Sequence, residues 1–279
     1  MESKGSFKKI NDVEIYYEHH GCPLKEQRPV LVMVHGYLSS AFSFRTLIPY
    51  LSDSFTIFAL DLPGFGQSEK SVKFFYSLDN YARLVIGFLD AMALKKAVLV
   101  GHSMGGQISL YAANQAPDRI VQVVGLSASG YLGRLRLWLR WASYLPFMSY
   151  YLQYFFRKKD IMQTFLEVVH NRDLVTNEMV EGYLAPLKNI DFYRSLVRLM
   201  RHREGDLTPL VLHTIRQPVL LLWGIEDRVV PVSVARRFKR DLPEVTLRTF
   251  ENTGHLLPEE KPEEVATEIK SFINQDVSG

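Results

Sequence analysis

The amino-acid sequence predicts an α/β protein built on a mostly parallel eight-stranded sheet with flanking helices. Short, continuously apolar runs suited to doubly buried strands alternate with helical patterns along much of the chain. This alternation stops between residues 130 and 215, where the spacing is helical throughout. A length of 279 residues and a hydrophobic fraction of 47% are enough for one large core plus an insertion.

The predicted strands and helices follow one another in a regular order. Two short strands joined by an Asn-Asp turn come first, at 7–10 and 14–18. The other six strands are predicted at 30–34, 56–60, 97–100, 121–126, 219–223 and 246–250. Helical patterns are found at 78–92, 104–114 and 262–274, and the last begins with proline and two glutamates, as helix N-termini often do. This order is typical of a parallel sheet with helices on both faces.

The segment 130–215 is predicted to be a helical cap on a core formed by residues 1–129 and 216–279. Its helices are expected at 162–171, 177–185 and 192–202. Between Tyr131 and Lys159 the chain has ten aromatic and six basic residues but no Asp or Glu. Two interpretations remain open: a cap that buries its aromatics while its arginines snorkel, or a lid that makes peripheral contact with anionic membrane lipid.

We expect two tryptophans of this segment, Trp138 and Trp141, to bind substrate. Aromatic residues without intervening carboxylates are typical of the walls of an apolar pocket. The segment therefore predicts that the small-molecule substrate has a large apolar part.

Composition and charge exclude several other classes of protein. The 33 basic and 30 acidic residues nearly balance, so we expect no nucleic-acid partner. The single cysteine, Cys22, cannot form an intrachain disulfide, and the histidines lack metal-ligand spacing, so we expect neither a metal nor a cofactor. We also expect no secretory signal and no transmembrane helix, which fits a cytoplasmic location.

The strongest chemical signal is the run Gly101-His102-Ser103-Met104-Gly105, in which a buried strand leads directly into Gly-x-Ser-x-Gly and a helix. A serine on so sharp a turn is exposed on strained backbone, and the glycines allow neighbouring backbone to approach. Ser103 is therefore the candidate nucleophile. The backbone N–H of Met104, at the helix N-terminus, is a candidate donor to a developing oxyanion.

A serine nucleophile needs a histidine base and a carboxylate that orients it. Asp227 follows the predicted strand 219–223, at the edge where ligands meet open α/β sheets, and is the candidate acid. His255 lies between the last strand and the last helix and is the candidate base. Glu226 is the competing acid. His102 is expected to be packed or hydrogen-bonded rather than to act as the base.

The order of these three residues resembles that of the α/β-hydrolase fold superfamily, in particular its capped serine esterases, lipases and C–C bond hydrolases. His35-Gly36-Tyr37 resembles the family's oxyanion loop, which implies that the Tyr37 N–H is the second oxyanion donor beside Met104. Residues 61–68, Asp-Leu-Pro-Gly-Phe-Gly-Gln-Ser, resemble a structural turn of the family. By motif, the resemblance covers residues 7–129 and 216–274.

The resemblance implies a serine hydrolase that cleaves a carboxylic ester with an apolar acyl or alcohol group through an acyl-enzyme. C–C bond hydrolysis or perhydrolysis on the same triad is an alternative, and so is a hydrolase-fold receptor that binds a small ligand with little turnover. A carboxylated ring-cleavage product would need an arginine inside the pocket, a role for which Arg194 and Arg198 are candidates. The sequence does not predict the oligomeric state.

Overall fold

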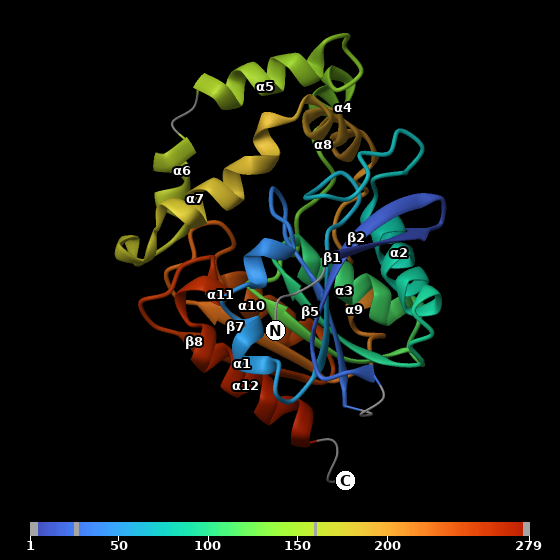
Figure 1. The fold of residues 1–279 in the computed structure, drawn as a ribbon, viewed down its shortest axis with the longest axis vertical. Coiled ribbons are helices and arrows are strands. Elements are labelled where there is room, and N and C mark those ends of the chain that lie inside the picture. The colour runs from blue at the N-terminus through green and yellow to red at the C-terminus, as the bar shows by residue number, and fades with distance from the viewer. Residues whose placement is uncertain (1–4, 25–27, 159–160, 276–279) are drawn as a thin grey trace.

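Eight strands form one sheet in the order β1-β2-β4-β3-β5-β6-β7-β8 (Figure 1). The structure is a computed structural model and describes residues 5–24, 28–158 and 161–275. The strands are β1 (Gly5–Ile10), β2 (Val13–Gly21), β3 (Val30–Val34), β4 (Thr56–Leu60), β5 (Ala97–His102), β6 (Ile120–Leu126), β7 (Val219–Gly224) and β8 (Val245–Phe250). β2 pairs antiparallel with β1 and β4, and the strands from β4 to β8 in the sheet order pair in parallel. The predicted mostly parallel sheet is confirmed.

Helices cover both faces of this sheet. Successive side chains of a central strand point to opposite faces, and because nearly all of them are apolar, each face needs a layer of helices to bury it. Val32 and Val34 of β3 belong to the larger core with α2, α3 and α10, whereas Leu31 and Met33 belong to a second core with α1 and α12. The helices flanking the sheet are α1 (Ile48–Leu51), α2 (Leu78–Ala91), α3 (Met104–Gln115), α10 (Val232–Asp241), α11 (Leu257–Glu260) and α12 (Pro262–Gln275), with a 3-10 turn, η2, at Ala41–Phe44.

A helical insertion, residues 127–218, separates β6 from β7 and lies beyond the carboxyl ends of the parallel strands (Figure 1). It contains α4 (Leu137–Ala142), α5 (Met148–Lys158), α6 (Ile161–Val168), η3 (Arg172–Leu174), α7 (Asn177–Leu184), η4 (Ala185–Lys188), α8 (Ile190–His202) and α9 (Pro209–Leu212). α8 anchors it, since Phe192, Tyr193 and Leu196 are buried in the larger core. Among the described residues, no helix is both long and apolar enough to cross a membrane.

The aromatic side chains of the first two helices of the insertion are mostly exposed, whereas one of the two interpretations of this segment has them buried. None of the residues of α4 or α5 is fully buried, and the side chains of Trp138 and Trp141 are 63% and 73% exposed. α4 and α5 rest mainly on α8, so one side of each is not covered by any other described part of the chain.

Candidate active site

Ser103 lies at the turn between β5 and α3, in a conformation that L-residues rarely adopt. Its φ is 52° and its ψ is −118°, so the backbone carries strain at this residue. Glycines make the turn possible: a Cβ at Gly101 would lie 2.3 Å from the carbonyl oxygen of Gly105, and one at Gly105 would lie 1.9 Å from that of Val34. Strained backbone at a strand-to-helix turn is the arrangement that presents a nucleophilic hydroxyl.

His255 and Asp227 form a buried pair. Asp227 follows β7, His255 follows β8, and His255 Nδ1 lies 2.8 Å from Asp227 Oδ2. The other carboxylate oxygen, Oδ1, accepts hydrogen bonds from the backbone N–H groups of Val229 and Val230, both at 2.8 Å. Three bonds therefore fix the carboxylate. It in turn orients the imidazole so that Nε2 is the nitrogen left to exchange a proton.

Glu226, the competing acid, occupies a different position. Its carboxylate accepts a hydrogen bond from the backbone N–H of Thr253 at 2.9 Å, and its own N–H donates to the Thr253 carbonyl at 3.1 Å. Glu226 thus holds the loop that carries His255, while Asp227 contacts the imidazole. The geometry favours Asp227 as the partner of the histidine.

Ser103 and His255 line the same cavity. Within the described residues no hydrogen bond joins the Ser103 hydroxyl to the imidazole, a bond that often shortens only when substrate binds. The arrangement brings together the three residues that the sequence singles out.

Two backbone segments that could hold an oxyanion meet beside Ser103. Met104 is the first residue of α3, so its N–H has no acceptor within the helix, whereas the Ser103 N–H already donates to the Leu126 carbonyl at 2.9 Å. The loop after β3 lies against the serine, since a Cβ at Gly36 would be 3.0 Å from Ser103 Cβ. Tyr37, the next residue, lines the cavity.

Two histidines near the site are held neutral. His35 Nδ1 donates to the Gly36 carbonyl at 2.7 Å, and its Nε2 accepts from the Leu62 N–H at 3.0 Å, so it braces the loop before Tyr37. His102 donates from Nε2 to the His255 carbonyl at 2.8 Å. Its Nδ1 is buried and has no partner among the described residues. Burial lowers the pKa of His35 to about 4, and burial together with the nearby His255 lowers that of His102 to about 3.

The cavity at Ser103 has a volume of about 250 Å³ and is apolar away from the catalytic groups. The insertion contributes six apolar or aromatic lining residues: Phe156, Phe165, Val168, Tyr183, Leu184 and Leu187. The core contributes Leu38, Val229 and Leu256. Neither Trp138 nor Trp141 is among the lining residues, and their exposed indoles point to a different role. Arg194 and Arg198 line a separate pocket, so no arginine of the described chain faces this cavity.

Glu260, which no motif of the sequence singles out, joins the insertion to the loop that carries His255. One carboxylate oxygen accepts from the Gly254 N–H at 2.9 Å, and the other accepts from the N–H groups of His170 and Asn171 at 2.8 and 3.2 Å. The His255 N–H also donates to the carbonyl of Val168, at 2.9 Å. The insertion therefore holds the backbone of His255, the candidate base, directly.

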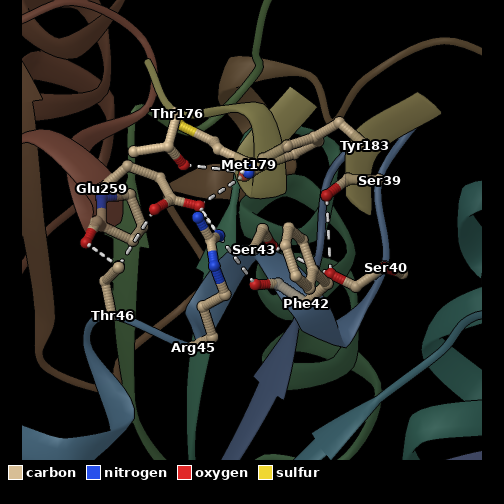
Figure 2. A network of polar contacts seen from close by, with 11 residues as sticks. Ser39, Ser40, Phe42, Ser43, Arg45, Thr46, Thr176, Met179, Tyr183 and Glu259 are labelled. Atoms are coloured by element: carbon tan, nitrogen blue, oxygen red, sulfur yellow. Dashed lines mark hydrogen bonds and ion pairs between the residues drawn. The ribbon is translucent and has the colours of Figure 1, made fainter. Parts of the chain in front are cut away.

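Its neighbour Glu259 anchors the insertion a second time (Figure 2). The Glu259 carboxylate pairs with Arg45, which follows η2, and accepts from the Tyr183 hydroxyl of α7 at 3.1 Å. The Thr46 hydroxyl donates to the carbonyl of Pro258 at 2.7 Å. One feature of the sequence could have indicated these contacts: Glu259 and Glu260 come directly after the apolar run that follows His255. Carboxylates buried next to such a run need hydrogen-bonding partners.

The neutral histidines predict loss of stability in acid. As the pH falls below 6.5, the ordinary histidine value, the unfolded chain takes up protons that folded His35 and His102 do not, which costs about 1.4 kcal/mol per pH unit for each group. We expect His102→Gln to reduce the loss in free energy of unfolding between about pH 7.5 and about pH 5 by roughly 2 kcal/mol. Urea denaturation measures this, with His213→Gln, at an exposed position, as the control. Equal slopes in all three proteins would contradict the prediction.

Comparison with known proteins places the chain in a family. A family model described as the alpha/beta hydrolase fold matches residues 29–262. The chain belongs to the α/β-hydrolase fold family and is a hydrolase.

Individual relatives differ in what they act on. The chain is 47% identical over 264 residues to an uncharacterized hydrolase, YugF, of Bacillus subtilis strain 168, over 95% of this chain and 96% of that protein. A bacterial membrane phospholipase A has a similar structure, with a TM-score of 0.81 and 25% identity over 98% of this chain and 86% of the other. A meta-cleavage product hydrolase from Pseudomonas fluorescens IP01 has a TM-score of 0.78 and 22% identity over 98% of both chains, a likeness in fold alone.

Proposed function

We propose that this hydrolase cleaves carboxylic esters with an apolar acyl or alcohol group, using Ser103, His255 and Asp227. The observation that carries the proposal is that Ser103, on its strained turn, and His255, which pairs with Asp227, line one cavity whose remaining walls are largely apolar. The similar protein named as a phospholipase A supports the ester class, because a phospholipase A also cleaves a carboxylic ester.

The proposed mechanism has two halves. Ser103 Oγ attacks the ester carbonyl while its proton passes to His255 Nε2, and the oxyanion receives hydrogen bonds from the backbone N–H groups of Met104 and Tyr37. Collapse of this intermediate expels the alcohol, which takes the proton from His255. Water then attacks the acyl-enzyme with His255 again as the base, and release of the acid restores Ser103. Asp227 stabilises the imidazolium in both halves.

The side chain at position 103 argues against epoxide hydrolysis and haloalkane dehalogenation, the reactions for which two similar proteins are named. If a serine opened an epoxide or displaced a halide at a saturated carbon, the product would be an ether between the serine and the substrate. Water at neutral pH does not cleave such an ether, so the enzyme would not turn over. Such reactions proceed through an ester on a carboxylate nucleophile, and residue 103 is a serine.

Hydrolysis of a C–C bond in a carboxylated substrate is the second candidate. A substrate carboxylate taken into an apolar site needs a charged or hydrogen-bonding partner. The basic side chains that line the cavity are those of His102 and His255 alone among the described residues, and His102 is held neutral. The cavity therefore suits an uncharged ester better.

The test is a series of p-nitrophenyl esters with increasing acyl length. We expect repeated turnover, with medium-chain esters cleaved faster than acetate because their chains fill the apolar cavity. Release of a single equivalent would instead identify a receptor that retains the triad. Faster turnover of a carboxylated vinylogous diketone than of any ester would identify a C–C bond hydrolase.

Variants of the insertion sharpen the same prediction. Phe165 lines the cavity and packs on Tyr183, with ring centroids 5.2 Å apart. Phe165→Ala should shift the optimum towards longer acyl chains, since it adds volume at the apolar end. Trp141→Ala, outside the cavity, is the matched control and should leave the ratio of kcat/KM values for different chain lengths unchanged. A shift in the Trp141 variant alone would contradict this assignment of the pocket wall.

A further inference from the structure

The outer surface of the insertion exposes many aromatic side chains, on the sides of α4 and α5 that do not rest on α8 and on the turn between them. α4, α5 and the turn between them lie at the end of the molecule, far from the sheet (Figure 1). Phe147 at the turn is 76% exposed, although phenylalanine is normally among the more buried residues. We define the aromatic face as the exposed side chains of Trp138, Trp141, Phe147, Tyr150, Tyr151 and Phe155. Large apolar side chains exposed together in one segment are typical of an interaction site.

The charged side chains of the segment that carries the aromatic face all have one sign. Between residues 131 and 158 the chain has no Asp or Glu, and the basic residues of this range are exposed: Arg134, Arg136, Arg140, Arg157 and Lys158. None of them forms an ion pair with another described residue. The charges are therefore available to a negatively charged partner.

A basic pocket lies against the same turn. Residues 144–149 and three arginines of α8, Arg194, Arg198 and Arg201, line a cavity of about 270 Å³. Arg194 pairs with Asp191 at 2.6 Å, and Arg201 donates to the Ser143 carbonyl. Arg198 Nη1 is buried and has no partner among the described residues. A buried guanidinium N–H without an acceptor is costly, and a phosphate oxygen is a suitable acceptor for it.

We propose that the aromatic face and this arginine pocket together form a docking surface for a membrane containing anionic phospholipid. Tryptophan and tyrosine are favoured at the boundary between headgroups and acyl chains, where an apolar ring can be buried while its polar atom stays wet. The basic residues attract the anionic surface, and the arginine pocket binds a headgroup phosphate. A second copy of the chain fits less well, because a two-fold contact through this face would bring like charges together.

Docking in this way would connect the membrane with the catalytic cavity. Phe155 of α5 is exposed on the aromatic face, whereas the next residue, Phe156, lines the cavity at Ser103. One helix therefore separates the lipid from the site. The inference goes beyond the proposed ester hydrolysis and does not depend on it, because binding is measured with the Ser103→Ala protein.

The tryptophans of the chain provide a direct readout. Two of the three, Trp138 and Trp141, belong to the aromatic face, and the third, Trp223, is fully buried in β7. We expect a blue shift of tryptophan emission when Ser103→Ala protein meets vesicles of phosphatidylcholine with one third phosphatidylglycerol. Phosphatidylcholine alone should give a much smaller shift, and high salt should reverse the shift on anionic vesicles. Quenching by brominated lipid should affect the same emission.

Paired variants separate the two parts of the surface. Arg136→Gln with Arg140→Gln should weaken vesicle association by roughly 25-fold, at about fivefold for each basic residue near an anionic surface. Arg198→Gln should reduce the preference for anionic over neutral vesicles. Phe147→Ser should weaken association with both kinds of vesicle. The matched control is Leu210→Ser with Arg216→Gln, exposed residues in α9 and just after it, at the part of the insertion away from α4 and α5 (Figure 1), which should bind like the parent protein.

Three results would overturn the proposal: no emission shift with anionic vesicles at low salt, equal binding by the parent and the Arg136/Arg140 variant, or equal weakening by the Leu210/Arg216 control. Analytical ultracentrifugation without lipid tests whether a second copy of the chain covers the aromatic face instead. A dimer that Phe147→Ser dissociates, in a protein that does not bind vesicles, would show that a second copy covers the aromatic face.

Discussion

Ser103→Ala is expected to lower kcat/KM for p-nitrophenyl esters by at least about 10⁴-fold, because it removes the atom that forms the acyl-enzyme. The protein should remain folded, with a thermal midpoint within a few degrees of the parent. Alanine keeps the Cβ, so the strained backbone at φ 52° is no worse than with serine, and the lost hydroxyl forms no hydrogen bond with another described residue.

Labelling identifies the nucleophile independently of rate. A serine-directed phosphonate should modify Ser103 in the parent protein and nothing in the alanine variant. Ser109→Ala is the matched control, since Ser109 is a buried serine of the same helix whose hydroxyl donates to the Gly105 carbonyl. Substantial turnover by Ser103→Ala, or labelling of another serine, would show that Ser103 is not the nucleophile.

Asp227→Asn is expected to have the second largest effect, a loss in kcat of about 10⁴-fold, the magnitude seen when a triad aspartate becomes asparagine. The reason lies in the three bonds at this side chain. Two backbone N–H groups donate to Oδ1, so the asparagine carbonyl oxygen must take that place and its NH₂ must face His255 Nδ1. The imidazole then has to carry its proton on Nε2, where it cannot accept the proton of Ser103.

Glu226→Gln is the comparison that makes this prediction sharp. The glutamine carbonyl can still accept from the Thr253 N–H, so we expect a loss of less than about tenfold. Steady-state kinetics of both variants, with circular dichroism to check folding, decides between the two acids. If the glutamine variant is the more damaged, Glu226 is the acid and the role given to Asp227 is wrong.

The parts of the fold that sequence could predict are those with short-range signals. β4 and β7 are apolar at almost every position, and the structure buries every residue of both. The Gly-x-Ser-x-Gly turn likewise carries its own signal, because glycine is required where backbone atoms approach this closely. Asp227 and His255 follow from their position after strands, since the carboxyl ends of parallel strands meet at one edge.

Orientation within the insertion could not be predicted. Helical periodicity indicates which side chains share one face of a helix. Where nearly every face is apolar, it does not indicate which face packs against the rest of the protein. Trp138 and Trp141 were expected at the substrate for this reason, and the structure places them on the outer surface. The partners of Glu259 and Glu260 were also hidden, since Arg45 lies 214 residues before Glu259 along the chain.

The bonds between the insertion and the histidine loop restrict how the cavity can open. A hinge that swung the whole insertion outward would separate Val168 from the His255 N–H and Glu260 from residues 170–171. The enzyme would then lose the backbone support of its base at the moment when substrate enters. Among the described residues, α4 and α5 form no hydrogen bond with the histidine loop and rest on α8, where Arg201 donates to the Ser143 carbonyl, so displacing them would leave residues 168–184 in place. Residues 168–184 are thus tied to the loop of the candidate base, whereas α4 is tied to α8, so we expect substitutions in α4 to leave the position of His255 unchanged.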